Sequence, residues 1–139
     1  MGRYDQQNRL AEVVEPNPTG NGTVSAAGSL VTKYTQDTLG RLVKTEQGNQ
    51  IREFKYDSLG RLTRQKLAEQ TATLNDAGVY VGAGMWSEAF WYDTRSNLTQ
   101  KTDARGVKTL LSYQTGGTDD PLNRLQARSY DLSGPHDTS

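Results

Sequence analysis

The sequence predicts an all-β protein built from antiparallel hairpins that follow one another along the chain. Two observations support this fold class: a short aromatic–Asp–x–x–Gly–Arg–Leu motif recurs through the sequence, and no segment has convincing helical periodicity. The composition agrees, because 33% hydrophobic residues and a mean hydropathy of -0.79 are lean for a compact two-layer domain. A twisted sheet with limited burial on each face fits these values better.

The motif occurs in five places and specifies a tight turn in each. The clearest copies are at 34–42 and 54–62, looser copies are at 4–10 and 90–98, and the copy at 120–125 lacks the aromatic residue. Asp favours the first position of a type I turn, and a left-handed residue after that turn gives the usual three-residue hairpin loop with a bulge. The left-handed position is occupied by Asn8, Gly40, Gly60, Ser96 and Asn123, of which Ser96 is the least suited.

This hairpin geometry also predicts which side chains face each other. The pair outside the Asp joins the preceding residue to the following leucine, which places Tyr4 opposite Leu10, Tyr56 opposite Leu62 and Tyr92 opposite Leu98. Each such pair is worth about 0.2–1 kcal/mol. The same register sets an Asp across from an Arg at 5 and 9, 37 and 41, 57 and 61, and 120 and 124. Gln36 and Asn97 depart from the pattern.

The remaining segments continue the strand–turn alternation. Strands are expected at 41–46 and 50–56, joined by a turn at 47–49, and at 107–113 after a turn at 103–106. Long connections interrupt the array at 16–28, 66–88 and 114–119. The first reads as a loop, the second contains a turn at 75–78 interpreted as an inserted hairpin, and the third reads as a glycine-rich bulge. We expect residues 1–139 to be a single array and a piece of a longer one.

The repeated Tyr-Asp-x-x-Gly-Arg-Leu motif resembles the YD repeat of the RHS/YD-repeat family, which includes bacterial polymorphic toxins, the cocoon component of insecticidal toxin complexes, and teneurins. The copies that carry the resemblance are 34–42, 54–62 and 92–106, and the match extends over most of residues 4–134. The resemblance implies a curved sheet of hairpins wound in a spiral around a hollow interior. The chain is too short for a closed shell, so an open fragment is expected. The segment Asp120-Pro121-Leu122-Asn123 continues as a repeat turn and does not match the family's self-cleavage segment.

By this resemblance, the chain is a non-catalytic structural segment of a shell that encloses, carries or presents a partner polypeptide such as a toxin. The expected partners are the remainder of a longer YD-repeat polypeptide or its cargo, and the expected location is secreted or at the cell surface. The alternative is a cell-surface adhesion or carbohydrate-binding module, in which Trp86 and Trp91 contact glycans or surface proteins. Free sheet edges further predict self-association.

Other function classes have little support. The sequence has 16 Lys and Arg residues and 16 Asp and Glu residues, so it lacks the excess of positive charge typical of nucleic-acid-binding proteins. No apolar run is long enough to span a bilayer, and the N-terminus lacks a signal-peptide pattern. Neither a thiolate nucleophile nor a phosphate-binding glycine motif is present.

Catalytic, metal and cofactor sites are not expected. The Asp and Arg residues recur at every turn, whereas an enzyme needs one site, and His136 is the only histidine. The adjacent carboxylates of Asp119 and Asp120 suit a hard cation, but their spacing matches no calcium loop. We therefore assign no catalytic, metal-binding or cofactor-binding residue.

Overall fold

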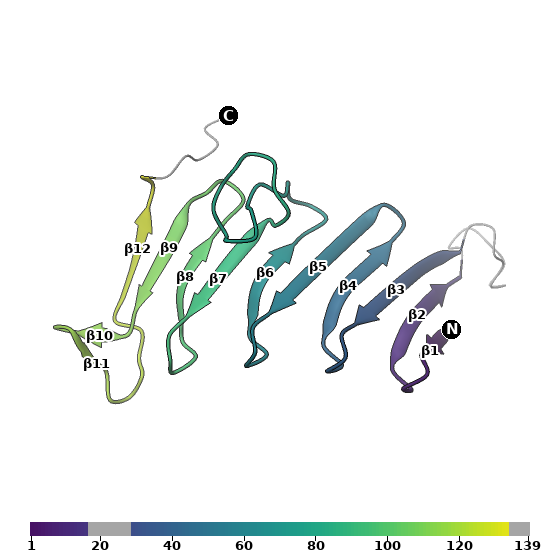
Figure 1. Cartoon of the computed structure of the whole chain (residues 1–139), viewed down its shortest axis with the longest axis horizontal. Coiled ribbons are helices and arrows are strands. Elements are labelled where there is room, and N and C mark those ends of the chain that lie inside the picture. The colour runs from purple at the N-terminus through teal and green to yellow at the C-terminus, as the bar shows by residue number, and fades with distance from the viewer. Residues whose placement is uncertain (17–28, 134–139) are drawn as a thin grey trace. The chain divides into compact units, whose positions relative to one another are not determined.

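The computed structural model describes residues 1–16 and 29–133, and within these ranges the chain is all-β and contains no helix (Figure 1). Ten strands are hydrogen-bonded in the order β1-β2-β3-β4-β5-β6-β7-β8-β9-β12, and β10 and β11 form a separate pair. All described strand pairings are antiparallel, and the strand order is open. The predicted fold class is therefore confirmed. The chain divides into two compact units, residues 1–54 and 55–139.

The first unit contains hairpins joined by tight turns. Its strands are β1 (Gly2–Tyr4), β2 (Leu10–Glu15), β3 (Leu30–Gln36), β4 (Leu42–Gln47) and most of β5 (Gln50–Tyr56). β4 and β5 pair through Gln47 and Gln50, which leaves a two-residue loop. Gly48 begins that loop with a φ of 58°, as a type II′ hairpin turn requires. Most of the connection predicted at 16–28 lies outside the described residues.

The second unit continues the same alternation. It contains β6 (Leu62–Lys66), β7 (Glu88–Tyr92), β8 (Leu98–Thr102), β9 (Lys108–Ser112) and β12 (Ala127–Asp131), with the short β10 (Gln114–Thr115) and β11 (Thr118–Asp119) between the last two. The segment 114–119 was expected to be a glycine-rich bulge and is instead a small hairpin. Gly116 and Gly117 both have positive φ, 60° and 82°, which allows a type I′ turn between β10 and β11.

The predicted register is present where the pairings are described. Tyr4 lies opposite Leu10, Gln36 opposite Leu42 and Tyr92 opposite Leu98. The register shifts immediately beyond each of these pairs, so that one residue of the returning strand is skipped. The sequence predicts a bulge at the turn itself but not this second irregularity farther along the hairpin, which has the form of a β-bulge and increases local twist.

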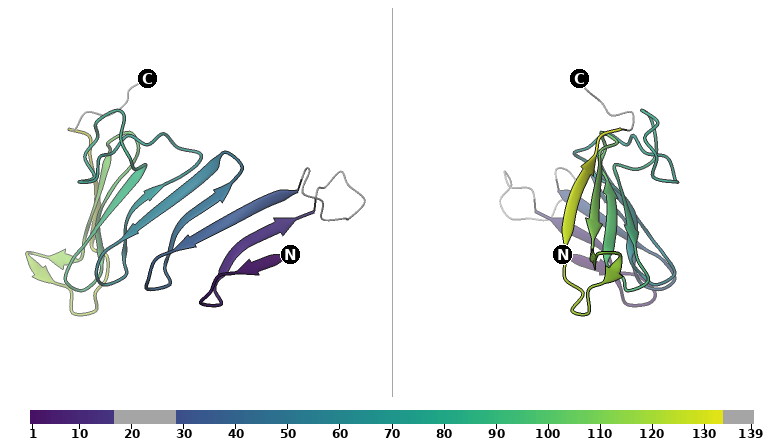
Figure 2. Two further views of the ribbon diagram at one scale, coloured as in Figure 1. Left: turned by 45° about the vertical axis from the view of Figure 1, so that its right-hand side comes forward. Right: turned by 90° about the vertical axis from the view of Figure 1, so that its left-hand side faces the viewer.

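The inserted segment between β6 and β7 and the residues next to it provide most of the fully buried side chains among the described residues. Leu74 has no exposed surface and forms isolated bridges to both Tyr80 and Trp86. Ser87 and Ala89, which follow the segment, are also fully buried. Figure 2 shows the segment projecting from one face of the unit's strands. This long connection thus forms a small local core.

The predicted turn within this segment is confirmed. The Gly78 N–H donates to the Asn75 carbonyl at 2.9 Å, and the Asn75 N–H donates to the Val79 carbonyl at 2.9 Å. This is the hydrogen-bond pattern of the Asp turns, with Asn75 replacing the aspartate. The antiparallel bridge between Leu74 and Tyr80 makes the segment an inserted hairpin.

Candidate functional site

The repeated turn is the most regular polar structure in the chain, and Asp57 shows its geometry. The Asp57 Oδ1 accepts the backbone N–H groups of Leu59 and Arg61, both at 2.9 Å, and its Oδ2 accepts the Arg61 Nε at 2.7 Å. The backbone N–H of Arg61, followed by its guanidinium, lowers the pKa of the Asp57 carboxyl against an opposing desolvation effect. Asp5 with Arg9 and Asp37 with Arg41 repeat these contacts and the lowered pKa. The predicted Asp–Arg pairing is confirmed at these three turns.

Two later turns keep the geometry with other partners. At Asp93 the side-chain amide of Asn97 takes the place of the guanidinium, with Nδ2 to Oδ2 at 2.9 Å. Partial desolvation opposes the hydrogen bonds from Asn97, yet the net effect lowers the pKa of Asp93. At Asp103 the carboxylate accepts the N–H of Val107 at 3.1 Å and pairs with Arg105. The turn therefore depends on the carboxylate more than on the arginine.

The copy at Asp120 forms the turn but not the hairpin. The Asn123 N–H donates to the Asp120 carbonyl at 2.9 Å, and Arg124 pairs with the carboxylate at 3.1 Å, as predicted. However, the Asp120 N–H donates to the Tyr113 carbonyl at 2.9 Å. The strand that follows this turn, β12, pairs with β9, because the β10–β11 hairpin occupies the preceding segment.

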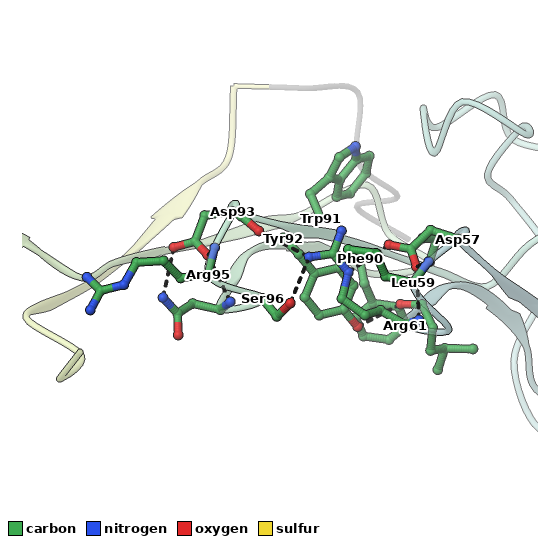
Figure 3. Close-up of polar contacts among 12 residues, drawn as sticks. Asp57, Leu59, Arg61, Phe90, Trp91, Tyr92, Asp93, Arg95 and Ser96 are labelled. Atoms are coloured by element: carbon green, nitrogen blue, oxygen red, sulfur yellow. Dashed lines mark hydrogen bonds and ion pairs between the residues drawn. The ribbon is translucent and has the colours of Figure 1, made fainter. Parts of the chain in front are cut away.

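The structure adds a second role for the turn arginines that the sequence reasoning missed. The Arg61 Nη1 donates to the Asp93 carbonyl at 3.1 Å and to the Ser96 hydroxyl at 3.2 Å, so it connects its own turn to the next motif copy (Figure 3). Arg9 reaches the Asp37 carbonyl at 2.8 Å in the same way. Arg95 reaches the Asp120 carbonyl at 3.2 Å from a different position of its turn. These contacts join residues of different hairpins, so they could not be predicted from the motif of a single hairpin.

Strand β7 presents three consecutive aromatic residues, each with a cation over its ring. The distances from cation to ring centroid are 5.7 Å for Lys101 over Phe90, 4.8 Å for Arg64 over Trp91 and 4.8 Å for Arg61 over Tyr92. The Tyr92 hydroxyl also donates to the Leu62 carbonyl at 2.7 Å, and burial raises the pKa of Tyr92. These contacts fix the orientation of the rings on the strand (Figure 3).

The two tryptophans proposed from sequence as ligand contacts occupy different positions. Trp91 is half-buried and lines a surface groove of about 400 Å³ together with Phe90, Arg64 and Asp76. Trp86 is also half-buried, and its indole N–H donates to the Asp76 carboxylate at 3.2 Å. Asp76 thus binds Trp86 and lines the same groove as Trp91.

An ion pair between a buried carboxylate and a partly exposed lysine is a further feature that the sequence did not predict. The Glu88 side chain is 8% exposed, and its Oε1 lies 2.6 Å from the Lys101 Nζ. Gln65 donates to the other Glu88 oxygen, so the carboxylate joins β6, β7 and β8. Glu88 and Lys101 also line a polar groove of about 560 Å³ beside the inserted segment. A buried carboxylate needs such partners because its desolvation is costly.

The carboxylates considered for a cation have protein partners. Asp119 accepts the Gln114 amide at 2.9 Å, and Asp120 is bound by Arg124 and Gln126. Within residues 1–16 and 29–133, no cluster of three or more His, Cys, Asp or Glu side chains has metal-binding geometry. His136 lies outside the described residues. A search of these same ranges for a helix long and apolar enough to cross a membrane finds none.

Comparison with known proteins gives a structural similarity and no sequence match. No family model matches the chain, and no curated protein matches it. The fold is similar to part of the crystal structure of TcdB2-TccC3, with a TM-score of 0.59 and 16% sequence identity. The match covers 94% of this chain and 6% of that chain. The chain therefore shares the fold of a small part of a much longer polypeptide.

Proposed function

We propose that the chain is a non-catalytic structural segment of an RHS/YD-repeat shell that encloses, carries or presents a partner polypeptide such as a toxin. The observation that carries this proposal is the fastening of one motif copy to the next. Arg9 and Arg61 each bind their own turn aspartate and the backbone carbonyl of the following motif aspartate. Side chains that bind two successive turns hold the consecutive hairpins of the sheet together.

The similarity in fold to a small part of TcdB2-TccC3, a much longer polypeptide, agrees with the same proposal. In this function the partners are the remainder of a longer YD-repeat polypeptide and its cargo, and the location is secreted or at the cell surface. In this function the turn aspartates stabilise the sheet, and the segment has no catalytic activity.

Protease protection of the cargo tests the proposal. The longer polypeptide that carries this segment is treated with protease, and cleavage of its downstream region is followed by mass spectrometry. We expect protection relative to the same region expressed alone, and partial loss of protection in Arg61→Ala. Arg105→Ala is the matched control, because its guanidinium contacts only its own turn carboxylate in the described structure. Equal cleavage inside the longer polypeptide and alone would contradict an enclosing function.

A second candidate, adhesion or carbohydrate binding, is favoured by one observation, the groove lined by Trp91. It combines aromatic rings with the charged groups of Lys55, Arg64 and Asp76, a combination suited to the apolar face and hydroxyl groups of a sugar. A glycan array with the parent chain, Trp91→Ala and Trp86→Ala tests it, with Tyr130→Ala as an exposed aromatic outside the groove. Absence of saturable binding by the parent, or equal binding by all variants, would remove this candidate.

A further inference from the structure

The polar groove of about 560 Å³ is lined by the inserted segment on one side and by β7, β8 and the turn after β8 on the other. Its volume lies within the range of small-molecule sites, about 300–1,000 Å³. The Thr73 hydroxyl donates to the Ala104 carbonyl at 2.5 Å and fixes the inserted segment against that turn. Both strands lie inside the strand order, so the groove does not depend on where the chain begins or ends.

The inserted segment is long for a connection between adjacent strands of this sheet. It spans residues 67–87, whereas the connection between β7 and β8 spans only residues 93–97. Long connections in compact domains commonly serve a function such as binding. The inserted segment is therefore the part of this unit in which a binding site is most expected.

The carboxylates that line the groove already have protein partners. The Glu88 Oε1 lies 2.6 Å from the Lys101 Nζ, and its Oε2 accepts the Gln65 amide. The Asp103 Oδ1 accepts the backbone N–H of Arg105 at 2.9 Å, and its Oδ2 accepts the Arg105 Nη2 at 2.7 Å. Every oxygen of the two carboxylates thus has a donor, so neither needs a cation from a ligand.

The cations of the groove keep donors that these contacts do not use. Lys101 has three N–H groups, and its contact with Glu88 takes one of them. The Arg105 guanidinium binds Asp103 through Nε and Nη2, and this leaves Nη1. The two side chains are 38% and 67% exposed, so the remaining donors are accessible. A matching ligand brings acceptors, and an anionic oxygen suits best because charge-assisted hydrogen bonds are the stronger ones.

The inserted segment adds neutral polar groups to the same groove. They are the Gln70 amide, the Thr71 hydroxyl and the Tyr80 phenol. None of these three side chains has a hydrogen bond to another residue that the structure describes. Amides and hydroxyls both donate and accept, as sugar hydroxyls do, and the half-buried Tyr80 ring offers an apolar surface beside them.

We propose that the polar groove binds an acidic saccharide. The carboxylate of a sugar residue binds Lys101 and Arg105, and the sugar hydroxyls bind Gln70, Thr71 and Tyr80. A neutral sugar would leave the spare donors of both cations to water, so the charge is part of the recognition. This site is separate from the groove lined by Trp91, and the inference does not rest on the proposed shell function.

An array of galacturonate, glucuronate and sialic-acid oligosaccharides tests the proposal, with each acid printed beside its carboxyl methyl ester. The ester keeps the hydroxyl groups and removes the charge. We expect saturable binding of at least one acid and binding of its ester that is at least about tenfold weaker. Titration calorimetry with the best acid then compares the parent chain with its variants.

Arg105→Gln should weaken the affinity about tenfold, and Tyr80→Phe, which keeps the ring, should weaken it about threefold. Lys101→Gln should weaken it at least as much as Arg105→Gln. Arg128→Gln is the matched control, because it removes an exposed arginine outside the groove and should have no effect. Circular dichroism of each variant checks that the fold is retained. If Lys101→Gln does not fold, the other two groove variants decide the outcome.

Several results would overturn the proposal. They are the absence of saturable binding to every acid, equal binding of an acid and its ester, and an affinity that Arg105→Gln and Tyr80→Phe leave unchanged. Lys55→Gln removes a cation from the groove lined by Trp91. Binding that is lost in Lys55→Gln and retained in Arg105→Gln would place the saccharide there instead.

Discussion

Gly78→Ala should destabilise the protein more than Gly60→Ala, although both glycines have the same left-handed backbone conformation. Gly78 has a φ of +78°, and a Cβ at this position would lie 2.7 Å from the Trp91 Cη2 and 2.8 Å from the Ala89 Cβ. A left-handed conformation costs a non-glycine residue about 1–2 kcal/mol. Overpacking against a buried neighbour adds about 1–3 kcal/mol. We expect the free energy of unfolding to fall by about 2–5 kcal/mol in total.

Gly60→Ala is the matched control for this prediction. Gly60 has nearly the same φ, +80°, and nothing lies within 4 Å of its added Cβ. It therefore carries only the backbone cost of about 1–2 kcal/mol. The difference between the two variants measures how closely the inserted hairpin packs on Trp91.

Urea unfolding, followed by tryptophan fluorescence and circular dichroism, measures both variants. The native-state emission should change in Gly78→Ala, because Trp91 has to move, and should stay unchanged in Gly60→Ala. Equal losses of stability in the two variants would refute the packing of the inserted hairpin on β7.

Three further outcomes are expected. Arg61→Lys should lower the free energy of unfolding by about 1–2 kcal/mol, because Lys cannot keep the contacts to Asp57 and to the next turn together. The control Arg105→Lys should change it by less than about 0.5 kcal/mol, and chemical denaturation measures both variants. Leu74→Ala should cost about 2–5 kcal/mol because Leu74 is fully buried, and Leu59→Ala, at 70% exposure, should stay within about 0.5 kcal/mol. The pKa of Asp57 is lowered in the folded state, so its stabilisation is present above the unfolded pKa and is lost as pH falls through the folded pKa. Asp57→Asn should therefore flatten the decline of Tm below about pH 4, and an unchanged acid profile would contradict this assignment.

Much of the fold could be predicted because its hairpins are local. The Asp at the turn entry, the left-handed residue at its exit and the aromatic–leucine pair beyond are all within seven residues, as at 4–10. The structure confirms even the weakest case, since Ser96 has a φ of 64°. The copy at Asp120 was less predictable, because its strand pairing depends on the intervening β10–β11 hairpin.

The candidate site was less accessible from sequence, because its decisive contacts join residues distant in the chain. The link from Arg61 to Asp93 spans 32 positions, and the ion pair between Glu88 and Lys101 depends on the register of two strands. Trp86 and Trp91 are five positions apart, yet Trp86 is hydrogen-bonded to Asp76 and Trp91 lines the groove. No local pattern encodes these differences.

The all-β class, the turn positions and the pairing next to each turn could be predicted from the sequence, because they depend on backbone preference and short-range hydrogen bonds. Tertiary structure decided how each turn is fastened to the next and how the inserted hairpin covers Trp91. Those outcomes depend on strand register, which accumulates along the chain and shifts at each bulge. Each Asp–Arg pair is thus encoded locally, and the folded sheet adds the contacts by which the arginines bind the next motif copy.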